Sequence, residues 1–206
     1  MSLAVLDALI PEGASNRPAL PMSPLYITVH ETGNASKGAN AKAHAAYLFG
    51  GGARERKVSW HYTVDDERAV RHIPETETAF HAGDGAGDGN RRSIGIELCV
   101  NSDGDFAKTK KNAAQLCALI LLRRRGLIIV QHNHWNGKNC PERLRAAGWE
   151  EFLETARREY FSLLAEKARD LGFINSPGYW EGVLRGNYPA KRDHLEELFS
   201  NIAARG

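Results

Sequence analysis

The strongest constraint on the fold is an apolar segment, Ile94–Val100, which has the composition of a strand in the middle of a sheet. Its hydrophobic side chains predict that both faces of this strand are covered. Two further strands are predicted at 25–29 and 127–130, and each leads into a polar segment. A hairpin is predicted from strands at 58–64 and 69–73, joined by an acidic turn.

Helices alternate with these strands. Apolar residues at helical spacing predict four helices, at about 40–49, 109–125, 150–171 and 195–203. The mixture of elements predicts an α/β fold with a central mixed β-sheet flanked by helices. The basic run Arg123-Arg124-Arg125 ends the second helix, where solvated cations complement the helix dipole.

The length of 206 residues suits one domain with a small addition. We expect an N-terminal lead-in at 1–23, a catalytic domain at 24–171 and a small helical C-terminal appendage at 172–206. The turn at 175–178, which contains proline and glycine, marks the second boundary.

The bulk properties exclude several classes of partner. A formal net charge of +2 argues against nucleic acid, and no apolar segment approaches the length of a membrane span. The first apolar stretch is broken at Asp7 and lacks a preceding basic segment, so we expect synthesis in the cytoplasm without a signal peptide. Cys99 and Cys117 have the pattern of buried thiols, and no disulfide framework is expected.

A short polar loop, Gln131–Pro141, follows the strand at 127–130 and holds His132 and Cys140. Imidazole and thiolate are preferred ligands of zinc. His30 occupies the same kind of position at the end of the strand at 25–29. Three protein ligands that leave one position open are typical of a catalytic zinc, so we expect one Zn²⁺ per chain.

Two charged residues accompany these ligands. Glu97 is unusual in an apolar strand, and as a general base it would have a task beside a metal-activated water. Zinc would lower the pKa of that water to roughly 7 and polarise a carbonyl. Lys138 could stabilise the oxyanion that develops during amide hydrolysis.

Structural interpretations remain open for most of these residues. His30 alone could be a hydrogen-bonded histidine at a strand end, Glu97 could pair with Arg91 or Arg92, and Lys138 could be a solvated loop lysine. His134 competes with His132, and could also be a fourth ligand of a structural site.

Three other histidines have ordinary structural or surface roles in our interpretation of the sequence. We expect His44 to lie on the surface, His61 to be structural or to support a ligand, and His72 to carry no functional signal.

Five separated segments resemble one enzyme family, in the family's order. They cover 29–34, 59–66, 80–85, 90–97 and 131–141. Together they resemble the zinc-dependent N-acetylmuramoyl-L-alanine amidases of the type-2 amidase family, and most closely its phage endolysin and autolysin branch. The family also includes a phage lysozyme and the peptidoglycan recognition proteins. The resemblance covers about residues 24–160.

The resemblance implies a mixed sheet with a groove for bacterial peptidoglycan. It implies cleavage of the amide between N-acetylmuramic acid and the L-alanine of the stem peptide. The family's zinc ligands fall on His30, His132 and Cys140, and its catalytic glutamate and loop lysine fall on Glu97 and Lys138. Substrate contacts are expected at His81, Trp60 and Asn34.

One residue departs from the wider family. Other branches place a catalytic tyrosine where this chain has Trp60. An indole cannot replace a phenol in proton transfer, so Glu97 is expected to carry more of the acid–base work.

Two alternatives share the same motifs: a cytoplasmic amidase that recycles soluble anhydro-muropeptides, and a non-catalytic peptidoglycan-binding protein. The latter class typically lacks the cysteine ligand, which is present here as Cys140. We expect a monomer that reaches the cell wall after holin-type release or lysis. The appendage is expected to help with wall binding or assembly.

Overall fold

The computed structural model describes residues 3–204, which form a six-stranded sheet with helices on both faces. The strand order is β1-β4-β3-β5-β2-β6, and only β3 and β4 pair antiparallel. The predicted mixed sheet flanked by helices is therefore confirmed. The strands are β1 (Ala4–Asp7), β2 (Tyr26–Glu31), β3 (Tyr62–Val64), β4 (Arg68–Arg71), β5 (Ser93–Leu98) and β6 (Ile128–Gln131).

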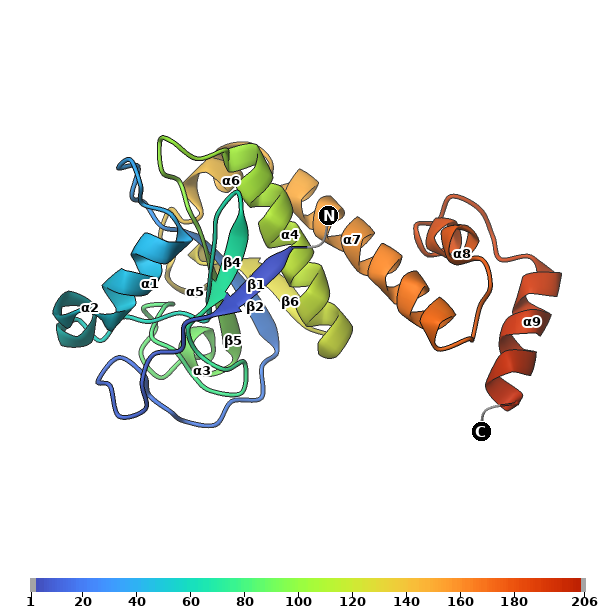
Figure 1. Ribbon diagram of the computed structural model, residues 1–206, viewed down its shortest axis with the longest axis horizontal. Helices are drawn as coiled ribbons and strands as arrows, with labels where there is room; N and C mark the ends of the chain where they lie inside the picture. Colours follow the sequence, from blue (N-terminus) through green and yellow to red (C-terminus); the bar gives the residue numbers. More distant parts are fainter. Residues whose placement is uncertain (1–2, 205–206) are drawn as a thin grey trace.

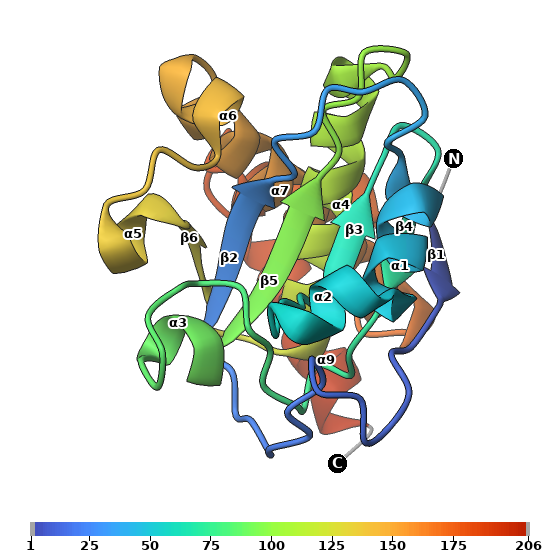
Figure 2. The ribbon, with the colours of Figure 1, turned by 90° about the vertical axis from the view of Figure 1, so that its left-hand side faces the viewer.

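Helices cover both faces of the sheet. Figure 2 shows α1 and α2 in front of the sheet and α4 behind it. The helices are α1 (Ala41–Phe49), α2 (Gly51–Glu55), α3 (Asp88–Arg91), α4 (Phe106–Arg123), α5 (Asn133–Asn136), α6 (Glu142–Ala146), α7 (Trp149–Asp170), α8 (Pro177–Leu184) and α9 (Arg192–Ala203). No helix in the described part of the chain is long and apolar enough to cross a membrane.

The two faces of β5 differ in chemistry. Ile94, Ile96 and Leu98 point to one side, where they pack with α4 and α7 in the main core. Ser93, Gly95 and Glu97 alternate with them and face the other side. The strand is covered on both faces as predicted, but its strict alternation makes one face polar, and this face carries the candidate site.

The N-terminal segment takes part in the sheet. The sequence predicts a lead-in at 1–23, whereas residues 4–7 form β1, an edge strand parallel to β4. An ion pair between Asp7 and Arg71 at 2.7 Å joins the two strands. Ile10 is fully buried in a second core with Leu48 and Ile73. All four side chains of β1 are exposed, so the strand lacks the alternation of buried apolar and exposed polar residues by which a strand is predicted from sequence.

The basic run at the end of α4 does not simply point into solvent. Arg123 and Arg124 both bind Glu75, at 2.6 and 3.0 Å, and Tyr62 donates a hydrogen bond to the same carboxylate. Burial opposes ionisation of Glu75, but these hydrogen bonds leave its pKa below the usual value. Arg123 and Arg125 are exposed, as the prediction of a solvated run implies, but the sequence did not indicate the pairing with Glu75, which lies far away along the chain.

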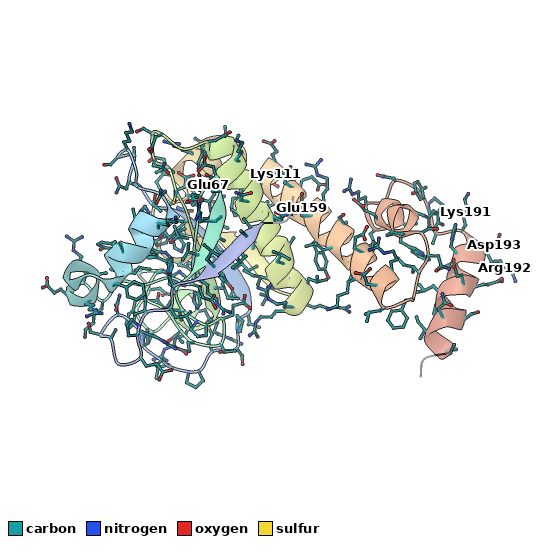
Figure 3. All side chains as sticks on the ribbon, in the orientation of Figure 1. Glu67, Lys111, Glu159, Lys191, Arg192 and Asp193 are labelled. Atoms are coloured by element: carbon teal, nitrogen blue, oxygen red, sulfur yellow. The ribbon has the colours of Figure 1, made fainter. Side chains whose placement is uncertain are left out.

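The C-terminal residues extend from the sheet domain. In Figure 1, α8 and α9 lie beyond the far end of α7, away from the sheet. Helix α8 begins inside the turn predicted at 175–178. Lys191, Arg192 and Asp193, which lead into α9, are exposed (Figure 3). Helix α9 is held by a ring stack between Tyr179 and His194, with centroids 3.8 Å apart.

A candidate metal centre at the end of a groove

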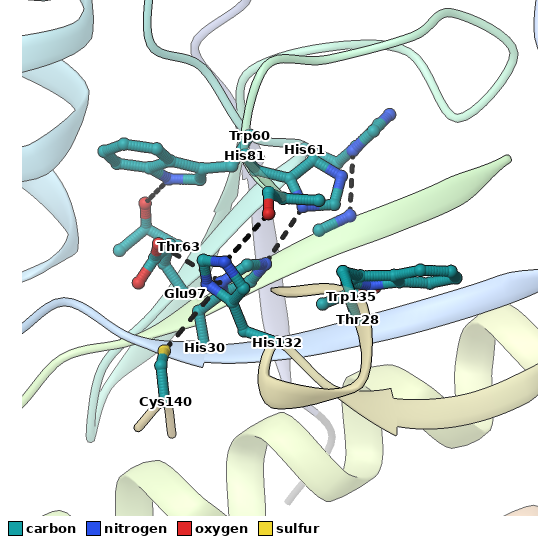
Figure 4. Close-up of polar contacts among 12 residues, drawn as sticks. Thr28, His30, Trp60, His61, Thr63, His81, Glu97, His132, Trp135 and Cys140 are labelled. Carbon is teal, nitrogen blue, oxygen red and sulfur yellow. Dashed lines mark hydrogen bonds and ion pairs between the residues drawn. The ribbon is translucent and has the colours of Figure 1, made fainter. Parts of the chain in front are cut away.

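Strand register brings the central residues of the site together. His30 of β2 pairs with Glu97 of β5, and Glu97 pairs with Thr63 of β3. Paired residues of neighbouring strands point to the same face, so these side chains form a row across the polar side of the sheet (Figure 4). His132 follows β6 directly, next to the end of β2.

His30, His132 and Cys140 form a group that could hold a metal ion. One donor atom from each lies within 4.8 Å of the others, and all three residues are buried. His30 Nδ1 lies 2.9 Å from His132 Nδ1 and 3.9 Å from Cys140 Sγ. Burial lowers the pKa of both histidines, so each ring is neutral at pH 7 and has a lone pair for a metal.

Hydrogen bonds behind the rings fix which nitrogen carries that lone pair. His81 Nε2–H donates to the Ser93 carbonyl at 3.2 Å, which leaves His81 Nδ1 to accept from His30 Nε2–H at 2.9 Å. His132 Nε2–H donates to the Ala82 carbonyl at 2.9 Å. Both Nδ1 atoms are then acceptors that face each other. Such a pair is repulsive unless a cation or proton lies between the rings, so the donor set fits a metal ion.

The cysteine loop is held against β2 by its backbone. Gly137 ends α5 with a φ of +79°, a conformation that turns the chain back. The N–H of Asn133 donates to the Cys140 carbonyl at 3.0 Å. The Glu31 carboxylate accepts the backbone N–H groups of Arg143 and Leu144, both at 3.0 Å, at the start of α6. Glu31 follows His30 directly, so it ties the loop to the strand; the sequence interpretation missed this role.

Glu97 lies beside the donor group without being fully paired. Its Oε1 is 4.0 Å from His30 Nδ1, and its Oε2 is buried with no hydrogen-bond partner in the described residues. Burial raises the pKa of Glu97 to about 8, although the nearby Lys138 ammonium opposes this shift. A buried carboxylate oxygen without a partner is costly and is characteristic of functional sites. Neither Arg91 nor Arg92 pairs with it.

The remaining histidines occupy varied positions. His134 is exposed beside Tyr26 and Trp135, outside the donor group. His44 was expected on the surface, but it is buried where α1 packs on the sheet, and its Nδ1–H donates to the Asn40 carbonyl. His61 is structural, as expected: Nε2–H donates to the Glu77 carbonyl and Nδ1 accepts from Gly95 N–H, both at 2.9 Å.

A groove opens from Glu97 along α1. Asn34 and Trp60, the residues predicted to contact substrate, line it together with Lys138. Trp60 is mostly buried, and its indole N–H donates to Thr63 Oγ1 at 2.7 Å. His81 is absent from the lining because it lies behind His30 (Figure 4). This position suits the orientation of a metal ligand rather than the substrate contact predicted from the sequence.

The sequence pattern of the N-acetylmuramoyl-L-alanine amidases matches residues 20–143, which include every residue of the site. The chain belongs to this amidase family. An amidase named XlyA from Bacillus subtilis is 47% identical over 72% of this chain and 49% of its own length. A second, CwlH from the same organism, is 46% identical over 70% of this chain and 57% of its own length. The chain thus spans about half the length of these relatives.

Solved amidase structures share the fold. The catalytic domain of XlyA has a TM-score of 0.70 and 44% identity, and the similarity covers 75% of this chain and 99% of that domain. The structure of PlyL has a TM-score of 0.65 and 30% identity over 76% of this chain and 97% of its own. The amidase fold and its sequence pattern therefore agree on the same region of the chain.

The support of His30 by His81 can be tested at Gly95. A Cβ at this position would lie 2.7–2.9 Å from the His81 ring, so the ring must move. We expect Gly95→Ala to weaken zinc binding by about 10–100-fold, the usual effect of disturbing a residue that orients a metal ligand. Competition with a chelator measures this. Gly51→Ala, where a Cβ meets open space, is the matched control. If Gly95→Ala and Gly51→Ala bound the metal with equal affinity, His81 would not be needed to orient His30.

Proposed function

We propose that the chain hydrolyses the amide between N-acetylmuramic acid and the L-alanine of the peptidoglycan stem peptide, and that it uses one zinc ion per chain. The observation that carries the proposal is the convergence of His30, His132 and Cys140 beside Glu97, at one end of a groove. Bound there, zinc would act as a Lewis acid toward the carbonyl and lower the pKa of water.

Glu97 is the proton-transfer residue of this proposal. Its Oε2 has no hydrogen-bond partner in the described residues. The charges of a bound zinc and of Lys138 would favour the ionised carboxylate against the effect of burial, and in this form Glu97 can accept a proton from the attacking water and then deliver it to the leaving amine. No other carboxylate among the described residues lines the groove. Trp60 cannot share this work, because its indole is only a donor and already binds Thr63.

Lys138 is placed to stabilise negative charge on the substrate. It lines the groove, and its positive charge is close enough to Glu97 to lower the pKa of that carboxyl, against the effect of burial. Its ammonium can therefore contact the carbonyl oxygen of the substrate as that oxygen becomes an oxyanion.

The proposed function is tested by exposing purified cell walls to the metal-loaded protein. We expect new L-alanine amino termini without new reducing sugar ends. New reducing ends would indicate a glycosidase. The absence of both products would overturn the proposal. Faster turnover of soluble anhydro-muropeptides than of intact walls would instead favour a recycling amidase with the same site.

The Lys138→Met variant tests the oxyanion role. An interaction made only in the transition state raises kcat without tightening substrate binding. We therefore expect kcat to fall by about 10²–10³-fold with little change in KM, as for the loss of one oxyanion donor. Steady-state kinetics on a soluble muropeptide measure both constants. A near-normal kcat with a raised KM would show that Lys138 only helps the substrate to bind.

A further inference from the structure

The groove continues beyond the reacting groups and holds two more cations, Lys37 and Arg56. It has a volume of about 710 Å³. Lys37 lies in the loop after β2, and Arg56 caps the end of α2, which follows directly after α1. Both cations line the same groove as Glu97 and Lys138. Figure 2 shows α1 and α2 together in front of the sheet.

The two cations differ in how far other protein charges compensate them. Neither forms an ion pair with a carboxylate of residues 3–204, whereas Arg17, Arg71 and Arg123 all do. Lys37 lies close enough to Asp103 to help lower the pKa of that carboxylate, after the larger effects of its hydrogen bonds to Asn101 and Gly38. Arg56 has no such partner, so it is the freer of the two cations.

Two aromatic rings line the same groove as Arg56. The rings of Tyr47 and Trp60 are nearly parallel, with centroids 6.4 Å apart and planes inclined by 18°. Both line the groove together with Arg56 and Val58. The two rings present apolar surface in the same groove, while Arg56 itself is exposed to solvent. A guanidinium matches the two oxygens of a carboxylate. This end of the groove therefore suits an acidic peptide.

We propose that Arg56, assisted by Lys37, binds a free carboxylate of the stem peptide; this inference rests on the proposed amidase function. The residue after L-alanine in peptidoglycan is a D-glutamate linked through its side chain, so its α-carboxylate is either free or capped as an amide. It is the acidic group of the peptide nearest to the scissile bond. Arg56 thus makes the chain selective for stem peptides with unamidated D-glutamate.

The experiment compares two N-acetylmuramoyl tripeptides that differ only in this group, one with D-glutamate and one with D-isoglutamine. We expect kcat/KM to favour the free carboxylate by about tenfold, the effect of one hydrogen bond between charged groups at a solvent-accessible site. Arg56→Gln should bring the ratio close to one, and Lys37→Gln should reduce it partly. Arg54→Gln, an exposed arginine of the same helix outside the groove, should keep the wild-type ratio.

Binding of both tripeptides to Glu97→Gln, measured by calorimetry, gives the same comparison without turnover. Equal affinities, or a preference that survives Arg56→Gln, would overturn the assignment of Arg56. The protein could release L-alanine termini from walls and yet use both tripeptides equally well. That result would overturn this inference and leave the amidase function intact. Walls that stay uncleaved would count against the proposed function itself.

Discussion

Replacing Glu97 with glutamine is expected to lower turnover by about 10²–10⁴-fold while one zinc per chain stays bound. The amide has nearly the same shape as the carboxylate but cannot take a proton at neutral pH. The metal should remain because Glu97 is not one of the three residues whose donor atoms converge. The Glu97 Oε1 atom lies 4.0 Å from His30 Nδ1.

Metal analysis and steady-state kinetics on the same preparation separate these effects. Glu142→Gln is a suitable control, because Glu142 is exposed in the first turn of α6, near the same loop. If the Glu97→Gln enzyme kept more than half of the wild-type turnover, the proton would have to be transferred by another group. Loss of zinc from this variant would instead make Glu97 part of the metal site.

The order of elements and the polar strand ends could be predicted because they depend on local patterns. In β2, Ile27 and Val29 alternate with Thr28 and His30, so the strand has a polar face that carries the candidate ligand His30. The same pattern in β5 places Glu97 on the polar face. Since parallel neighbours are in register, the two residues become partners across β2 and β5.

Residues whose roles depend on distant partners could not be assigned from the sequence. His81 follows a loop, and only the fold places its ring against Gly95 and His30. Glu31 looks like a polar residue at a strand end until α6 presents its N–H groups. The sequence does contain one usable signal, since a glycine inside the apolar strand β5 indicates close approach by another group.

The last of the site predictions concerns Cys140. Burial raises the pKa of its thiol to about 11, so the group is protonated at neutral pH when no metal is bound. Metal binding replaces this proton, which the pull of the cation on a thiolate makes favourable. A serine hydroxyl at the same place is a much poorer ligand, because it holds its proton more tightly and lacks the soft sulfur. The donor group would then keep only its two histidines, His30 and His132.

Cys140→Ser is therefore expected to lose most of the zinc and the activity together. Zinc at 100 times its Kd stabilises the folded wild type by about 2.7 kcal/mol. For a chain of this size this raises the Tm by about 5–10 °C, and the variant should show little of this increase. Cys117→Ala changes a buried residue of α4, so this variant should keep the response to zinc despite a lower Tm. A Cys140→Ser protein that metal analysis finds fully loaded would remove Cys140 from the ligand set.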